Sequence, residues 1–276
     1  MQLSENRKNS WVPFVILIPI TLPILIMYLW LLLSSVSTGM NGLIPKGFTL
    51  SNWSVLWQAI PGKASIWAYF FNTVLFAFFV AIFEVLIAAA AAYAIARLNF
   101  PGRRIFLSLT IVLHAFPAIT LIIALFYILR MLGLYDTLVG VVLVKLALGI
   151  PFSIWILKGF FDNVPWDIEI AAMVDGSSRF NIWRKIMIPM VGPGLAAVAI
   201  FTFLSSWSEF MIVYIFAPNS NNQTLSILLN MLSGDPDRIQ LGLIVAIAVF
   251  YIAPVLLFYF VTQKYLMNMY GGGVKG

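Results

Sequence analysis

The stretch "DIEIAAMVDGSSRFNIWRKIMIP", from Asp167 to Pro189, is charged and amphipathic in a chain that is otherwise mostly apolar. Of the 276 residues, 62% are hydrophobic and only 9% are charged, and the mean hydropathy is +1.00. A soluble domain of this length carries more charged side chains than that, so the composition excludes this class. The polar stretch is therefore interpreted as a loop between membrane-embedded segments.

Apolar runs on both sides of this loop are long enough to cross a bilayer. A spanning helix needs about 20 apolar residues, and backbone groups in lipid must form hydrogen bonds within the segment. The first run follows basic residues as a signal peptide does, but it is longer and lacks a cleavage pattern, so we expect an uncleaved span. The sequence predicts an all-α polytopic membrane protein with six transmembrane helices, at about 12–33, 67–96, 105–129, 137–157, 190–217 and 239–263.

The distribution of Lys and Arg predicts the orientation, because positive residues accumulate on the cytoplasmic side of membranes. With the N-terminus inside, four basic residues lie outside: Lys46, Lys63, Arg130 and Arg238. Eleven lie inside, namely Arg7, Lys8, Arg97, Arg103, Arg104, Lys158, Arg179, Arg184, Lys185, Lys264 and Lys275. We therefore expect both the N- and C-termini and the loop at 167–189 to be cytoplasmic.

Several site chemistries are excluded by residues that the chain lacks. It has no cysteine, so disulfides and cysteine-based metal or nucleophilic sites cannot form, and His114 is its single histidine. No G-x-x-x-x-G-K-[ST] motif occurs, so we expect no ATP binding or hydrolysis by this chain. The net charge of +6 is ascribed to loop topology and not to a nucleic-acid partner. We expect no cofactor and no metal site.

Local signals within the loop predict two helices separated by a turn. Asp167 and Glu169 suit a helix N-terminus, and Gly176 is typical of a left-handed residue that ends a helix. Ser177 or Ser178 is expected to cap a second helix. The apolar stripe of that helix is predicted at Phe180, Trp183, Ile186 or Met187, and Met190, with Arg179, Arg184 and Lys185 directed away from it.

Two interpretations of this helix pair remain open from spacing alone. It is either an interfacial pair with basic residues near lipid headgroups, or a docking element for a cytoplasmic partner. Docking would use the small side chains of Ala171 and Ala172, which allow another surface to approach closely.

The order of residues in the loop resembles the EAA motif of membrane subunits of ATP-binding-cassette (ABC) importers. Ile170 occupies the position usually held by Glu in that motif, and the neighbouring Glu169 points about 100° away on a helix. The resemblance implies a coupling helix that docks on a cytoplasmic ATPase subunit. Its implied interface residues are Glu169, Ala171, Ala172, Asp175, Gly176, Ile186 and Pro189.

Other segments resemble permeases of the carbohydrate-uptake branch of these importers, maltose-type permeases above all. They include "FFNTVLFA" from Phe70, "AAYAIARLNFPGRR" ending at Arg104 and "FLSSWSEF" ending at Phe210. The resemblance implies a type I ABC importer permease (MetI-like) core in the inner membrane. The implied organisation is a cytoplasmic tail, first span and outer loop at 1–66, a core at 67–263 with its EAA loop at about 158–190, and a cytoplasmic tail at 264–276.

The same resemblance implies the partners of the chain. They are a second permease subunit, a dimer of cytoplasmic ATP-binding subunits that carries ATP and Mg, an extracytoplasmic sugar-binding protein and membrane lipid. The implied function is therefore ATP-driven uptake of a sugar or oligosaccharide, in which this subunit is not itself an enzyme.

Polar side chains inside the spans are candidates for the substrate pathway, because such groups are costly in lipid and usually face a cavity. Asn72, Glu84, Trp207 and Glu209 are the candidates, since amides, carboxylates and indoles bind sugar hydroxyls and rings. The alternative is a structural pair between a carboxylate and Lys145 that stabilises helix packing.

Two other classes of protein remain as alternatives. In a secondary transporter driven by an ion gradient, Glu84, Lys145 and Glu209 would be the coupling charges. The absence of visible inverted halves and the presence of the amphipathic loop argue against this class. A membrane scaffold without transport activity would show no solute-dependent stimulation of an ATPase.

Overall fold

The computed structural model describes residues 12–115, 117–234 and 241–271 of the chain, which is almost entirely helical there. The helices are α1 (Val12–Ser35), α2 (Ile66–Arg97), α3 (Arg103–Ala115), α4 (Ala118–Met131), α5 (Leu138–Asp162), α6 (Trp166–Val174), α7 (Arg179–Ile182), α8 (Ile188–Met190), α9 (Gly192–Trp207), α10 (Met211–Phe216), α11 (Leu225–Ser233) and α12 (Leu241–Gly271). A π-helical turn, η2 (Trp183–Met187), joins α7 to α8. The remaining elements are the 3₁₀ turns η1 (Ser51–Leu56) and η3 (Ser220–Asn222) and the strands β1 (Gly39–Asn41) and β2 (Ile44–Lys46).

The chain divides into two compact units, one of residues 1–59 with 229–253 and one of residues 60–228 with 254–276. In the first unit, β1 and β2 pair as an antiparallel hairpin after α1. The buried side-chain amide of Asn52 donates hydrogen bonds to the carbonyl oxygens of Ser35 and Ser37, at 3.1 and 2.8 Å. These bonds hold η1 against the end of α1.

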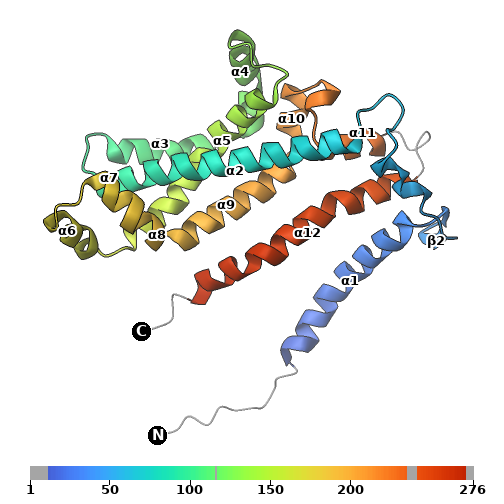
Figure 1. Cartoon of the computed structure of the whole chain (residues 1–276), viewed down its shortest axis with the longest axis horizontal. Coiled ribbons are helices and arrows are strands. Elements are labelled where there is room, and N and C mark those ends of the chain that lie inside the picture. The colour runs from blue at the N-terminus through green and yellow to red at the C-terminus, as the bar shows by residue number, and fades with distance from the viewer. Residues whose placement is uncertain (1–11, 116, 235–240, 272–276) are drawn as a thin grey trace, which may run out of the picture. The chain divides into compact units, whose positions relative to one another are not determined.

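The second unit is built on α2, which packs lengthwise against α5 and α9 (Figure 1). Ala88, Ala89 and Ala92 on α2 are buried, and such small side chains let neighbouring helices approach closely. The N-termini of α2 and α5 are capped by local side chains. Ser65 accepts a hydrogen bond from the backbone N–H of Ala68 at α2, and Thr137 accepts one from Gly140 at α5. Local sequence thus defines where α2 and α5 begin, and small residues of α2 allow its close packing.

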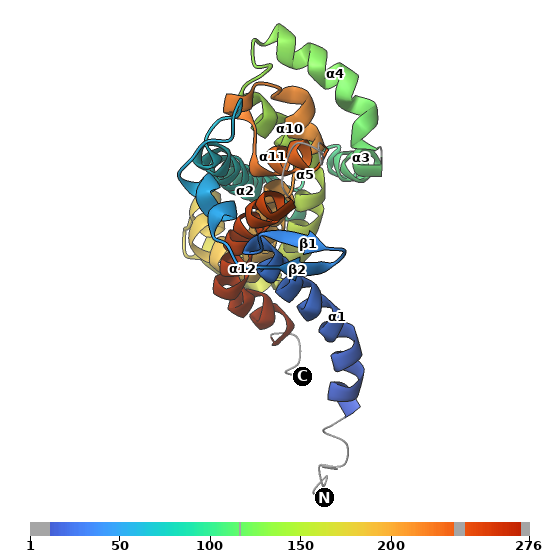
Figure 2. The ribbon, with the colours of Figure 1, turned by 90° about the vertical axis from the view of Figure 1, so that its right-hand side faces the viewer.

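The expected class of membrane-spanning all-α protein is confirmed. Within the described part of the chain, four helices are long and apolar enough to cross a membrane, namely α1, α2, α5 and α12. The bent pair of Arg179–Met190 and α9 makes five if it is counted as one span. The predicted third span at 105–129 is two separate helices, α3 and α4, of 13 and 14 residues (Figure 2). The count of six spans and the placement of the termini stay predictions.

The predicted fifth span at 190–217 is also interrupted, because α9 ends at Trp207 and α10 begins at Met211. Glu209 lies in the break, where its carboxylate Oε1 accepts a hydrogen bond from the backbone N–H of Ile212 at 3.2 Å. Its carbonyl oxygen accepts a hydrogen bond of 2.6 Å from Ser226. Side-chain bonding of this kind competes with helical hydrogen bonds and explains why the apolar run is not one helix.

Candidate functional site

The loop at 167–189 forms the predicted helix, turn and helix, and it extends beyond the C-terminal end of α2 (Figure 1). Gly176 has φ of +81°, a left-handed conformation that glycine adopts without the steric cost of a Cβ. Ser178 is the cap of the second helix, because its Oγ accepts a hydrogen bond from the backbone N–H of Asn181 at 3.4 Å. Both local signals in the sequence therefore correspond to the observed turn.

The predicted apolar stripe of the second helix is wrong in part. Ile182 and Met187 are fully buried, whereas Phe180 is 62% exposed and Met190 is 42% exposed. Ile182 is the buried residue of α7, and Phe180 precedes the π-helical turn η2. The additional residue of η2 changes which side chains share a face only beyond Trp183, as at Met187 and Met190. The segment then bends by 74° where it meets α9.

Glu169 is buried within its own chain and makes three polar contacts. Its Oε1 accepts a hydrogen bond from the Tyr93 hydroxyl at 2.7 Å and one from Arg179 at 3.3 Å. Its Oε2 lies 3.6 Å from Nε of Arg97, which is itself buried. The carboxylate thus joins α6 to α2 and to α7, and it is not on the surface of the loop.

Arg97 extends this buried cluster to the end of α5. Its guanidinium donates hydrogen bonds of 2.5 Å to the carbonyl oxygens of Phe161 and Val164, and it lies 4.4 Å from the centre of the Trp166 ring. The sequence interpretation used Arg97 only as a marker of orientation and did not identify Tyr93. One signal in the sequence pointed to these two residues: both lie near the end of an apolar run, and they are four residues, or one helical turn, apart.

The exposed face of α6 is formed by other residues. Ile170 is 48% exposed and Val174 is 82% exposed, and Ala171 and Asp175 lie on the surface beside them. Ala172 is buried in the core of the chain, so only one of the two alanines is available to an approaching partner. Ile186 is half-buried and Pro189 is exposed.

A cavity of about 390 Å³ lies among α2, α4, α5, α9 and α10. Its lining is mostly apolar, and its polar side chains are Glu84, Lys145, Ser153, Thr202, Ser205 and Glu209. Two of the four predicted pathway residues, Glu84 and Glu209, are therefore brought together with Lys145 in one cavity. Among the residues that the structure describes, no group of three His, Cys, Asp or Glu side chains is arranged to hold a metal ion.

The two carboxylates of the cavity have different partners. Glu209 pairs with Lys145, whose Nζ lies 2.6 Å from its Oε2 and also donates a hydrogen bond of 3.0 Å to Ser205. Glu84 accepts hydrogen bonds from Ser153 at 2.5 Å and Thr202 at 3.1 Å, and so connects α2 with α5 and α9. An ion pair with Lys145 exists, as the structural alternative expected, and its carboxylate is that of Glu209.

Asn72 and Trp207 do not line this cavity. The side-chain amide of Asn72 donates hydrogen bonds to the carbonyl oxygens of Asn221 and Gln223, at 2.7 and 3.0 Å, which hold the segment before α11. Trp207 is buried between aromatic rings, 6.3 Å from Phe70 and 5.8 Å from Phe203. Both side chains are engaged in packing within the bundle.

Comparisons with known proteins agree with this architecture. The protein "Trehalose transport system permease protein SugB" of Mycobacterium tuberculosis (strain CDC 1551 / Oshkosh) is 30% identical over 247 residues, which cover 88% of this chain and 89% of that protein. The "Diacetylchitobiose uptake system permease protein NgcG" of Streptomyces coelicolor (strain ATCC BAA-471 / A3(2) / M145) is 31% identical over 267 residues, which cover 95% and 87%.

A solved structure shares the fold. It is described as the "crystal structure of a bacterial ABC transporter involved in the import of the acidic polysaccharide alginate", and one of its chains matches with a TM-score of 0.74 at 22% identity. The match covers 91% of this chain and 96% of that one.

Residues 84–267, about two thirds of the chain, match the family described as "Binding-protein-dependent transport system inner membrane component". Members of this family form the membrane-spanning part of importers, and a separate subunit hydrolyses ATP. The chain belongs to this family and is a multi-pass inner-membrane permease subunit of an ABC importer.

Proposed function

We propose that the chain forms half of the translocation pathway for a sugar or oligosaccharide, and that its loop at 167–189 couples this pathway to a cytoplasmic ATPase. The observation that carries the proposal is the contrast within α6. Its inner side is fixed to α2 by the buried carboxylate of Glu169, while Ile170, Ala171 and Val174 face outward without covering side chains. A force applied to that exposed face reaches α2 through a rigid connection.

The choice of a sugar rests on the cavity and on the named functions of the relatives. Carboxylate, ammonium and hydroxyl groups of Glu209, Lys145 and Ser205 supply both donors and acceptors for solute hydroxyls. The two relatives above are named for transport of trehalose and uptake of diacetylchitobiose. Both solutes are sugars, and both proteins match this chain over most of their length.

The proposed assembly contains a second permease subunit, two ATP-binding subunits that hold ATP and Mg, and a sugar-binding protein outside the cell. In this assembly both termini and the loop of this chain are cytoplasmic. ATP closes the ATPase dimer, which draws the two coupling loops together and opens the cavity outward to receive solute.

Reconstitution of the complete importer in vesicles tests this function. We expect a sugar delivered by the binding protein to stimulate ATP hydrolysis, and we expect uptake to require ATP and to persist when proton and sodium gradients are collapsed. Uptake by this chain alone in response to an ion gradient, without ATP, would overturn the proposal in favour of a secondary transporter.

A further inference from the structure

A second cavity, a groove of about 330 Å³, lies where α2 passes the segment from α7 to α9. Its wall is apolar and is formed by Val85, Leu86 and Ala89 of α2 and by Leu195 of α9. Leu86 is 56% exposed, so the groove opens onto the outer surface of the helix. An opening of this composition on a membrane-spanning helix suits a hydrocarbon chain.

The mouth of the groove is aromatic and basic. Phe180, Trp183 and Arg184 line it, and the rings of Phe180 and Trp183 lie 5.6 Å apart. Arg184 and the adjacent Lys185 are exposed, and neither forms an ion pair with a carboxylate in the described part of the chain. Two uncompensated positive charges beside an apolar groove are complementary to a ligand with an anionic head and an apolar tail.

The backbone holds these aromatic and basic side chains on a segment with the geometry of an interfacial helix. The segment Arg179–Met190 meets α9 at 74°, which is the geometry of a helix that lies along a membrane surface before the chain turns to cross it. Tryptophan and arginine are enriched at that depth, where the aromatic ring is near acyl chains and the charge is near headgroups. The π-helical turn η2 carries Trp183, which is half-buried, and Arg184 and Lys185, which are exposed.

We propose that the groove binds one anionic phospholipid of the cytoplasmic leaflet. An acyl chain lies against Val85, Leu86 and Leu195, and the phosphate of the headgroup lies at Arg184 and Lys185. The site goes beyond solute import, and it rests on the cytoplasmic placement of the loop proposed above. It implies two roles for the loop: α6 docks on the ATPase subunit, and α7 with η2 binds lipid.

Native mass spectrometry of the complete importer tests the site, with phosphatidylglycerol and phosphatidylcholine of identical acyl chains as probes. We expect selective retention of phosphatidylglycerol, reduced about fivefold by Arg184→Gln, since each basic side chain at a surface contributes about that factor. The matched control is Arg104→Gln, which removes the same charge from an exposed arginine on α3. Unchanged selectivity in Arg184→Gln, or an equal loss in Arg104→Gln, would overturn the proposal.

A second measurement separates lipid from a protein occupant. The chain has no cysteine, so Phe180→Cys introduces a single thiol at the mouth of the groove. A maleimide that partitions into lipid is expected to label it in the assembled importer. Protection in the assembled importer, together with labelling of the isolated subunit, means that another subunit covers the groove and overturns the lipid site. If ATP-driven uptake is normal in the same preparation, such a result overturns the lipid site alone and leaves the proposed transport function intact.

Discussion

The buried carboxylate of Glu169 determines how the coupling loop is attached to the bundle. It lies beside two arginines, Arg97 and Arg179, and accepts a hydrogen bond from Tyr93. Arg97 is almost completely buried, so the charge of Glu169 balances a cation that has little access to water. A buried charge of this kind is costly when its partner is removed, although the intact pair need not add much net stability.

Glu169→Gln is expected to destabilise the loop, because Arg97 then loses its counter-charge in a buried site. We expect a loss of about 3–5 kcal/mol in the free energy of unfolding, measured by thermal denaturation in detergent, with faster proteolysis within residues 166–190. The control is Asp162→Asn, which breaks the partly exposed pair with Lys158 and should cost at most about 1 kcal/mol. Equal effects of the two substitutions would contradict the role of Glu169.

Gly149 on α5 tests the placement of Glu84. A Cβ at residue 149 would lie 2.8 Å from the side-chain carboxyl carbon of Glu84, which is held by Ser153 and Thr202. Gly149→Ala should therefore displace the carboxylate and reduce stability by about 1–3 kcal/mol. Gly159→Ala, on the same helix with no atom within 4 Å, is the control and should be neutral or stabilising. A neutral Gly149→Ala would show that α2 and α5 do not pack as described.

The ion pair of Lys145 and Glu209 is open to a separate test. Glu209→Gln leaves the ammonium group without its counter-charge in a cavity, and Lys145→Met does the same to the carboxylate. If the pair only holds α5 to the break after α9, the double variant should recover stability and transport relative to either single variant. If the groups bind solute, stability recovers and the concentration of solute for half-maximal ATPase stimulation still rises in the double variant.

At the scale of elements, local features of the loop were predictable and distant pairings were not. Gly176 and Ser178 act within a few residues, so their turn and cap follow from sequence. The bond between Tyr93 and Glu169 joins residues 76 positions apart, and hydropathy carries no information on such pairs. Hydropathy also predicted a continuous span across Glu209, because it does not include the side-chain hydrogen bonds that end a helix.

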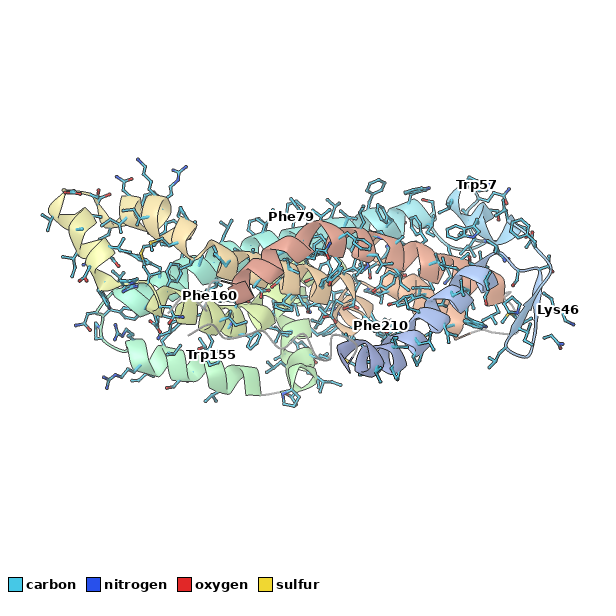
Figure 3. The ribbon with its side chains drawn as sticks, turned by 90° about the horizontal axis from the view of Figure 1, so that it is seen from below. Lys46, Trp57, Phe79, Trp155, Phe160 and Phe210 are labelled. Carbon is cyan, nitrogen blue, oxygen red and sulfur yellow. The ribbon has the colours of Figure 1, made fainter. Side chains whose placement is uncertain are left out.

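A substitution on the exposed face of α6 tests whether this helix docks on the cytoplasmic ATPase subunit. Ala171→Trp adds a large side chain to that face without entering the core, so we expect ATP hydrolysis to continue while uptake per ATP falls severalfold. The control is Asn181→Trp. Asn181 is also exposed in the loop, but it lies on α7 and not on the proposed docking face of α6. Figure 3 draws the side chains of this end of the bundle, and of these Ala171 and Asn181 are exposed. Normal uptake by Ala171→Trp would contradict docking through α6.

At the scale of the whole molecule, the orientation in the membrane can be tested with two single-cysteine variants, because the natural chain has no cysteine. Lys46→Cys lies on exposed β2 and is predicted outside, and Lys185→Cys lies in the loop and is predicted to be cytoplasmic. In right-side-out vesicles, an impermeant maleimide should label the first directly and the second only after permeabilisation. The opposite result would place the loop outside the cell and exclude a cytoplasmic ATPase as its partner.

The bend before α9 and the break after it leave a helix of only 16 residues. At about 1.5 Å per residue this helix is about 24 Å long, shorter than the roughly 30 Å of hydrocarbon in a typical bilayer. A helix shorter than the hydrocarbon is accommodated by a thinner bilayer, by flanking side chains that reach the interface or by packing against other helices, and each ångström of mismatch costs a fraction of a kcal/mol. Membrane thickness therefore enters the energetics of this permease, and acyl-chain length is expected to bias its conformational equilibrium without contacting the solute or the nucleotide.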